Sequence, residues 1–249
     1  MSISYGLKNK NVVISGGTSG IGLEIAKKLI KETANVFILG RSKERANAAL
    51  KVLGSGYYVS CDVKSETSCK EAIKKVLEKV DRIDILINSA GIYREERLET
   101  VTEEDFDLTM KVNVLGTMFL SKACLPYMIS GEDANIVNVG SDAGVEGNYG
   151  CIVYCASKGA IVSLTKAMAL DYAPKVRVNC VCPADVETPI VEKQLSGGSY
   201  TLEEMGEVYP LGRIAKVSEV AHVILAVVSP HNSFMTGSII NVDGGLTAK

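Results

Sequence analysis

The stretch Asn11-Val-Val-Ile-Ser-Gly-Gly-Thr-Ser-Gly-Ile-Gly-Leu-Glu-Ile-Ala-Lys-Lys-Leu-Ile30 decides how this chain folds. It opens with an apolar, β-branched run, which is typical of a buried strand. A glycine-rich turn over 16–22 follows, and the residues after it have the pattern of a helix. A strand, a tight turn and a helix in this order predict the first unit of a parallel sheet with helical crossovers.

The same alternation continues along the chain. Continuously apolar strands that are separated by helices indicate a parallel sheet covered on both faces. No linker, low-complexity run or internal repeat marks a boundary, so we predict an α/β fold with a single domain over 1–249. It is a doubly wound (Rossmann) seven-stranded parallel sheet with helices on both faces. We expect strands at 12–15, 36–39, 57–60, 83–88, 135–139, 176–181 and 239–242, and helices at 20–32, 42–53, 65–80, 103–128, 152–173 and 217–228.

The composition limits which binding partners and which cellular compartment are expected for this protein. The net charge is −2, with 27 Lys and Arg against 29 Asp and Glu, which argues against nucleic acid or an anionic membrane as main partners. No run approaches the ~18 apolar residues of a membrane span, and residues 1–10 lack a signal-peptide core. The seven cysteines show neither a secreted disulfide framework nor zinc-site spacing. We expect a reduced, cytoplasmic protein without a metal site.

The glycine turn is suited to binding a dinucleotide. Glycine lets the backbone come close to a pyrophosphate, which the N-terminus of the following helix then stabilises. The spacing is G-x-x-x-G-x-G rather than the commoner G-x-G-x-x-G, and an ordinary strand-to-helix loop is the alternative. The strand–turn–helix context favours cofactor binding by Gly16, Thr18, Ser19, Gly20, Ile21 and Gly22.

The end of the second expected strand bears on the choice of cofactor. NAD-binding folds usually place an acid about 20 residues past the glycines, but here Gly40 is followed by Arg41 and Ser42. A guanidinium can hold a 2′-phosphate with two hydrogen bonds, whereas a carboxylate would repel it. This favours NADP(H), with NAD(H) still possible. Alternatively, Arg41 is a solvated loop residue and Ser42 only a helix N-cap.

Polar and small residues close the next strands. Asp62, followed by Val63, could accept a hydrogen bond from an adenine or could simply start a turn. Asn88, Ala90 and Gly91 follow a buried strand and leave room for a flat ligand, although Asn88 could also crosslink strands.

One polar residue falls inside an expected helix. Asn113 is unfavourable in a helix interior because its side chain competes for backbone hydrogen bonds. It therefore suggests a local break, a bound water or a satisfied core polar group.

Ser141, Tyr154 and Lys158 can meet at one point. Tyr154 and Lys158 are four residues apart, so they share one face of a helix. A phenol has a pKa of about 10, and a cation one turn away lowers it. Ser141, on the loop after an apolar strand, could hold a substrate oxygen while the phenol exchanges a proton with it.

In their order and spacing, these residues resemble the short-chain dehydrogenase/reductase family over essentially the whole chain, including its 3-oxoacyl-ACP reductase and sugar-alcohol dehydrogenase members. The set is completed by Pro183 with Thr188 and by Gly237 with Asp243-Gly-Gly. Ser15, Ser89 and Ala184 depart from the usual Thr, Asn and Gly without removing a catalytic group.

The resemblance implies roles for the matching residues. Tyr154 would be the general acid or base, and Lys158 would lower its pKa and hold the nicotinamide ribose. Ser141 would orient the substrate carbonyl, and Asn113 would hold a proton-relaying water. Hydride would pass between nicotinamide and substrate carbon without a metal. The loop with Pro183, Val186 and Thr188 would bind the nicotinamide.

The implied function is the interconversion of a secondary alcohol and a ketone, with a small-molecule substrate. Open alternatives are a 3-oxoacyl-thioester reductase, an NAD-dependent sugar, polyol or hydroxysteroid dehydrogenase, and a non-catalytic dinucleotide-binding regulator. A mobile substrate lid is expected near 189–210, around Gly197-Gly198, and a homotetramer is implied by the resemblance. The pocket is expected to be lined by Tyr93, Ala143, Val145, Glu146, Tyr149 and Cys151.

Overall fold

The computed structural model describes residues 4–131, 133–196 and 201–248. Its described residues form one seven-stranded sheet in the order β3-β2-β1-β4-β5-β6-β7, with every pair parallel. This confirms the predicted fold class. The strands are β1 (Asn11–Ser15), β2 (Asn35–Gly40), β3 (Tyr57–Ser60), β4 (Ile85–Asn88), β5 (Ala134–Val139), β6 (Val176–Pro183) and β7 (Ile239–Val242).

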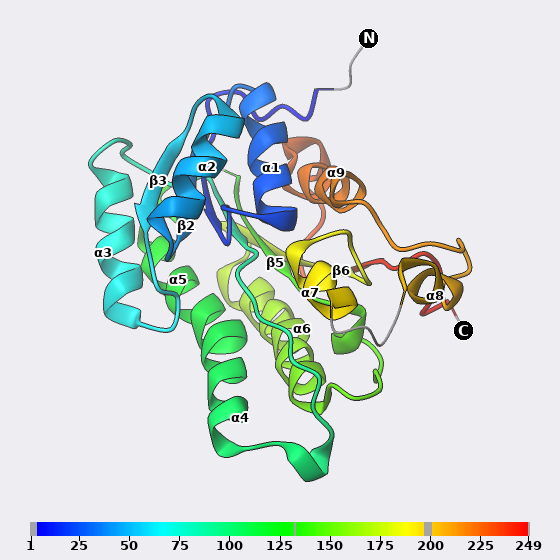
Figure 1. The fold of residues 1–249 in the computed structure, drawn as a ribbon. Helices are drawn as coiled ribbons and strands as arrows, with labels where there is room; N and C mark the ends of the chain where they lie inside the picture. Colours follow the sequence, from blue (N-terminus) through cyan, green and yellow to red (C-terminus); the bar gives the residue numbers. More distant parts are fainter. Residues whose placement is uncertain (1–3, 132, 197–200, 249) are drawn as a thin grey trace.

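Helices cover both faces of the sheet (Figure 1). One face is packed by α1 (Gly20–Lys31), α2 (Lys43–Leu53) and α9 (Val217–Val228). The other is packed by α3 (Glu66–Leu77), α5 (Gly116–Cys124) and α6 (Ile152–Tyr172). The remaining helices are α4 (Glu103–Met110), α7 (Pro189–Ser196) and α8 (Leu202–Glu207). Among the described helices, none is both long and apolar enough to cross a membrane.

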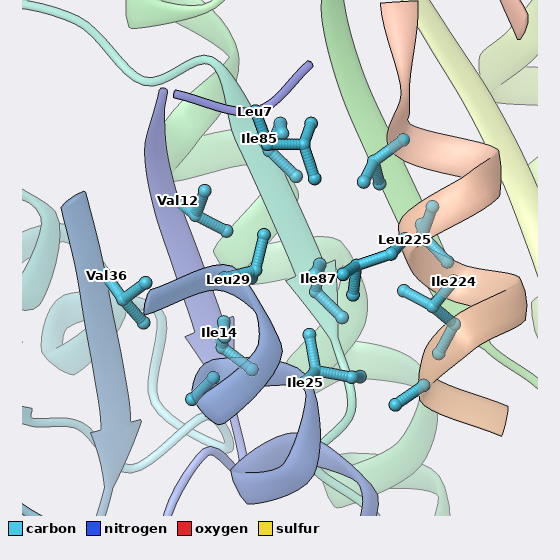
Figure 2. Close-up of a cluster of buried hydrophobic side chains, with 14 of the residues drawn as sticks. Leu7, Val12, Ile14, Ile25, Leu29, Val36, Ile85, Ile87, Ile224 and Leu225 are labelled. Carbon is cyan, nitrogen blue, oxygen red and sulfur yellow. The ribbon is translucent and has the colours of Figure 1, made fainter. Parts of the chain in front are cut away.

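Alternating strand side chains build two cores. Val12 and Ile14 of β1 point to the first face, where Figure 2 shows Ile25 and Leu29 of α1 beside Ile224 of α9. Val13, between them in sequence, belongs to the core on the opposite face, as the two-residue period of a strand requires. Each such aliphatic side chain is fully buried and contributes roughly 1.5–3 kcal/mol. The continuous apolar runs are thus explained by burial on both faces.

The expected helix over 103–128 is wrong as a single element. The structure divides it into α4, a π-helical turn (Lys111–Leu115), α5 and a 3-10 turn (Leu125–Tyr127). The break suggested by Asn113 is confirmed, because Asn113 lies inside the π turn. Such turns are frequent at functional sites. The other expected elements agree within about three residues at each end, while α7 and α8 were not expected as helices.

The chain changes direction across the sheet between β1 and β4, which are neighbours. Ligands of doubly wound folds bind at such a switch point, outside the carboxyl ends of the strands. The Ser15 hydroxyl accepts hydrogen bonds there from the backbone N–H groups of Ser89 at 3.1 Å and Ala90 at 3.2 Å. The hydroxyl of Ser15 therefore ties together the turns after β1 and β4.

Candidate active site

The turn between β1 and α1 is shaped for close backbone approach. Gly16 and Gly20 have φ of +67° and +51°, which favour glycine. A Cβ on Gly22 would lie 2.5 Å from the carbonyl oxygen of Gly16, so a side chain does not fit. Ser19 makes no side-chain capping bond to α1 within the described structure, which leaves the first amides of α1 for an anion. The turn fits a dinucleotide pyrophosphate.

Two arginines lie near this turn, Arg41 just after β2 and Arg45 in the first turn of α2. Ser42 accepts a hydrogen bond from the N–H of Arg45 at 3.2 Å, so Ser42 caps α2 as the alternative interpretation held. Arg41 is exposed. Arg45 lines a cavity of about 350 Å³ together with Thr18 and Ser19. Sequence reasoning missed Arg45, which lies in the first turn of α2, three residues after the N-cap Ser42.

Asp62 and Asn88 both have structural roles. Asp62 accepts from the N–H of Lys64 at 3.1 Å, which is a turn interaction. The amide nitrogen of Asn88 donates to Asn138 at 2.9 Å and to Ser121 at 3.1 Å, and so crosslinks β4, β5 and α5. The Asn88 Oδ1 is buried and has no partner among the described residues. A buried acceptor without a donor is rare and costs about 1–3 kcal/mol, so a bound group with a donor would suit this strand end.

Gly91, in the turn after β4, lies close to two candidate catalytic residues, Asn113 and Lys158. A Cβ on Gly91 would lie 3.4 Å from Asn113 Oδ1 and 3.7 Å from Lys158 Nζ. The Asn113 side chain accepts from the N–H of Ile92 at 2.9 Å and donates to Ser157 Oγ at 3.0 Å. Asn113 is therefore a satisfied core polar group that holds the turn after β4 against α6.

Tyr154 and Lys158 lie together on α6, as their spacing predicts. Lys158 Nζ is 5.6 Å from the centroid of the Tyr154 ring and donates to the carbonyl of Val139 at 2.9 Å. The ring of Tyr93 meets the Tyr154 ring edge-on, with the centroids 5.0 Å apart. Tyr93, expected in the substrate pocket, is thus in contact with the candidate acid.

Burial is the largest cause of the pKa shifts of Tyr154 and Lys158. It lowers the pKa of Lys158 and raises the pKa of Tyr154, against a smaller lowering by the Ser141 side chain. The pKa of Tyr154 is therefore raised, where the sequence predicted a fall beside Lys158. Removal from water disfavours the charged form of each group, phenolate and ammonium alike.

The loop after β5 places Ser141 against α6. A Cβ on Gly144 would lie 2.6 Å from the carbonyl oxygen of Lys158, so the loop backbone touches the helix backbone. Ser141 is 6% exposed, and its hydroxyl donates to Asp142 Oδ1 at 2.7 Å. Sequence reasoning missed Asp142, since an acid next to a serine gives no sign of burial.

The loop after β6 reaches the glycine turn. β6 ends at Pro183, and Val186 pairs with Ala215 in an isolated bridge. Thr188 Cγ2 lies 3.3 Å from where a Cβ on Gly20 would stand. The structure therefore brings the expected nicotinamide loop to the expected pyrophosphate turn.

Sequence reasoning also missed Asp185, an acid on the loop after β6. Tyr209 donates its hydroxyl to Asp185 at 2.7 Å, and burial raises the pKa of Asp185. Asp185 contributes to the raised pKa of Tyr154, so it belongs to the electrostatic environment of the site.

Other expected pocket residues divide into two groups. Ala143 and Cys151 are buried, whereas Val145 and Tyr149 are 45% and 104% exposed and face solvent. The expected mobile pair Gly197-Gly198 lies outside the described residues.

The chain is similar to known proteins in both sequence and structure. The sequence family described as enoyl-(acyl carrier protein) reductase matches residues 16–247. The chain is 37% identical to the 3-oxoacyl-[acyl-carrier-protein] reductase of Thermotoga maritima, covering 96% of this chain and 98% of that protein. It is 35% identical to the 2-(S)-hydroxypropyl-CoM dehydrogenase 3 of Xanthobacter autotrophicus, covering 99% and 100%. The solved structure of ElxO with NADP bound has a TM-score of 0.91 at 30% identity, covering 97% and 100%.

The chain therefore belongs to the short-chain dehydrogenase/reductase family and is an oxidoreductase.

Proposed function

We propose that this protein interconverts a secondary alcohol and a ketone with NADP(H), using Tyr154 as the general acid and base. The observation that carries the proposal is the contact at Gly91, where the turn after β4 lies against Asn113 and Lys158. It supports the proposal because the turn expected to bind the cofactor lies beside the buried Lys158, whose neighbour on α6 is Tyr154.

Each residue has a task in this scheme. Bound NADP(H) supplies or accepts the hydride. Tyr154 gives a proton to the substrate oxygen in reduction and takes it back in oxidation, which typically contributes ~10²–10⁴-fold. Burial raises the pKa of Tyr154, so the phenol is protonated at neutral pH, the form that reduction requires. Ser141 orients the substrate oxygen, and Lys158 holds the cofactor ribose.

The arginines beside the glycine turn support NADP(H) over NAD(H). Arg41 is exposed at the end of β2, and Arg45 shares a cavity with Thr18 and Ser19. Guanidinium groups bind phosphate through paired hydrogen bonds. We expect them to hold the 2′-phosphate of the adenosine ribose, near Asp62 and Val63 at the adenine. Pro183, Val186 and Thr188 would hold the nicotinamide.

A substrate screen tests the proposal. The protein is mixed with ketones or alcohols and with each cofactor in turn, and the absorbance of the reduced nicotinamide is followed. The panel includes 3-oxoacyl thioesters, sugars and polyols, and hydroxysteroids. The 3-oxoacyl thioesters are included because the Thermotoga maritima relative is a 3-oxoacyl-[acyl-carrier-protein] reductase. We expect turnover of one class, faster with NADP(H). Cofactor binding without turnover of any class would favour a dinucleotide-binding regulator, and faster turnover with NAD(H) would contradict the NADP assignment.

We further propose that the chain acts as one domain with a substrate lid at 189–210. The described parts of that segment include α7 and α8. Val191 and Tyr209 pack with Ile214 in a small apolar cluster that is separate from the two main cores. Lids that close over a site commonly gate catalysis.

A cytoplasmic homotetramer is the proposed working form. All seven cysteines are free thiols, which suits a reducing compartment. Several large apolar side chains are exposed, including Met118, Ile152, Leu170 at 83% and Phe234 at 104%, and exposed apolar surface often marks an interface. Light scattering of the purified protein tests this, with four chains expected and a monomer contradicting it.

A further inference from the structure

Two cysteines that flank Tyr154 in the sequence are in contact with each other. Cys151 is the N-cap of α6 and Cys155 lies four residues later, and their Sγ atoms are 3.6 Å apart. The N–H of Cys155 donates to the carbonyl of Cys151 at 2.9 Å, so both thiols belong to the first turn of the helix. Side chains four residues apart on a helix are neighbours, which accounts for the contact.

The two thiols differ in their access to solvent. The structure describes all seven cysteines, and Cys155 is the only one of them that is not buried. A small neutral oxidant such as hydrogen peroxide can therefore reach its sulfur. Cys151 is buried, and burial raises its pKa to about 12. Because the reactivity of a cysteine follows its exposure and its thiolate fraction, Cys155 is the expected site of first attack.

Two other pairs of cysteines are close but have no such access. The Sγ atoms of Cys180 and Cys182 on β6 are 3.6 Å apart, and those of Cys61 and Cys69 are 4.0 Å apart. All four of these residues are buried. The pair at the start of α6 therefore differs from them in combining contact with exposure.

The backbone of Asn148 connects the two thiols to the loop of Ser141. The thiols of Cys151 and Cys155 donate to the Asn148 carbonyl, with the sulfurs at 3.6 and 3.9 Å. The Asn148 side-chain amide donates to Asp142 Oδ2 at 3.1 Å, and the Ser141 hydroxyl donates to Oδ1 of the same carboxylate at 2.7 Å. A disulfide has no S–H to donate, so oxidation would remove the thiol donors that hold this loop.

Oxidation would also move the first turn of α6. The Cβ atoms of residues four apart on a helix are separated by about 5–6 Å, whereas a disulfide requires about 3.8 Å. The turn that carries Tyr154 must therefore tighten by about 1 Å or more. A displacement of this size at a reacting group can lower a rate about 10²-fold.

We propose that Cys151 and Cys155 form a dithiol site for hydrogen peroxide, and that its oxidation to a disulfide reversibly switches off turnover. In the first step peroxide converts the Cys155 thiol to a sulfenic acid and one water leaves. The Cys151 sulfur then attacks the Cys155 sulfur, so that the S–S bond forms and the S–O bond breaks. The hydroxyl leaves with the Cys151 proton as a second water. Two electrons pass from the two sulfurs to one peroxide.

The contact and the strain of the bond suit a transient modification. A thiol held against its partner has a high effective concentration, which offsets the small thiolate fraction of Cys151. A disulfide formed against the spacing of a helix is more easily reduced, and disulfides of reducing compartments are usually transient and redox-sensing. The loss of turnover rests on the proposed function, because it takes Tyr154 and Ser141 as the groups that act on the substrate. The bond itself does not.

Mass spectrometry tests the bond. The reduced full-length protein is treated with hydrogen peroxide, the peroxide is removed, and free thiols are alkylated after unfolding. We expect a disulfide between Cys151 and Cys155, with the other cysteines alkylated. A bond between another pair, or oxidation elsewhere with these two thiols still free, would overturn the proposal.

Turnover measurements test the switch. Peroxide should lower the wild-type kcat about 10-fold or more, and dithiothreitol should restore it. Cys155→Ser cannot form the bond, so it should keep the rate that it has without peroxide. Cys69→Ser is the matched control, because it removes one thiol of a close but buried pair and should respond to peroxide like the wild type. Equal losses in the wild type and Cys155→Ser would overturn the proposal, as would a bond with unchanged kcat.

The two measurements keep this inference distinct from the function on which it builds. A wild type that turns over no carbonyl or alcohol would contradict the proposed function, while mass spectrometry would still decide whether the bond forms. Where Cys155→Ser folds poorly, Cys155→Ala removes the same sulfur and carries the test.

Discussion

The candidate site lies at the carboxyl edge of the sheet, and the two halves of this edge differ in residue composition. The half expected to bind the cofactor, at the ends of β1, β2 and β4, is mostly glycine and backbone, with Gly22 close to Gly16; we call it the cofactor half. The half expected to bind the substrate, at the ends of β5 and β6 and the start of α6, holds the buried side chains of Asp142 and Lys158 and the half-buried Tyr154; we call it the substrate half. The first half is therefore sensitive to added volume, and the second to charge and pH.

This difference follows from what each half must hold. A cofactor of fixed shape is bound by a fixed surface, which close backbone packing supplies. A proton transfer needs groups whose pKa values are shifted by their surroundings. Substitutions in the two halves should accordingly have separable effects.

The largest effect is expected at Tyr154. Tyr154→Phe removes the only atom of the side chain that can carry the proton, so kcat should fall about 10³-fold or more with any active substrate. Initial rates with saturating NADPH measure it. Tyr149→Phe is the matched control, since Tyr149 is 104% exposed and should keep wild-type rates. A Tyr154→Phe protein with unchanged kcat would remove the proposed mechanism.

The next largest effect is expected at Gly22. Its added Cβ would lie 2.5 Å from the Gly16 carbonyl oxygen, so Gly22→Ala must shift the pyrophosphate turn. We expect about 10²-fold weaker NADPH binding and a loss of roughly 2–3 kcal/mol of unfolding free energy. Gly147→Ala is the control, because a Cβ there meets nothing within 4 Å. Equal NADPH affinity in both variants would show that the turn does not hold the cofactor.

A smaller, purely electrostatic change is expected at Arg41. Arg41→Asp places a carboxylate near the expected 2′-phosphate and should shift the ratio of kcat/KM for NADPH over NADH by about 10- to 100-fold toward NADH. The Arg45→Ala variant should shift it in the same direction by less. If both ratios stay at the wild-type value, the NADP assignment is wrong.

The smallest effect concerns the pH dependence of stability. Burial lowers the pKa of Lys158, so between that lowered pKa and about 10.4 the unfolded chain binds more protons there than the folded one. Stability from this group is thus gained as pH rises, by at most about 1.4 kcal/mol per pH unit. Lys158→Met should lack this gain.

Denaturant titrations of wild type and Lys158→Met, kept below pH ~10, measure the difference. The raised pKa of Tyr154 has the opposite sign and acts above that range. Parallel stability curves for the two proteins would contradict the burial of a titrating lysine.

The cofactor half was largely predictable from sequence, and for a physical reason. Glycine spacing and strand–turn–helix order are local properties, and in the structure Gly16 and Gly20 adopt the positive φ that glycine allows in a tight turn. The break at Asn113 was also predictable, because a mid-helix asparagine conflicts with helix hydrogen bonding. The π turn that realises it depends on the turn after β4, which is distant in sequence.

The substrate half was predictable only in part. The i, i+4 spacing correctly set Tyr154 beside Lys158, but the direction of the Tyr154 pKa depends on burial that no local pattern encodes. Asp142 and Asp185 were missed for the same reason, since their environments come from loops that meet only in the folded chain. Arg45 was missed although the sequence predicts a helix that begins just after Arg41 and contains it.

The separability of the two halves is tested most directly by one titration. NADPH fluorescence is followed as Tyr154→Phe and Gly22→Ala are each added to the cofactor. We predict a dissociation constant within about 2-fold of wild type for Tyr154→Phe and one raised about 10²-fold for Gly22→Ala. Equal weakening in the two variants would contradict a cofactor half that holds its ligand independently of the proton-transfer half.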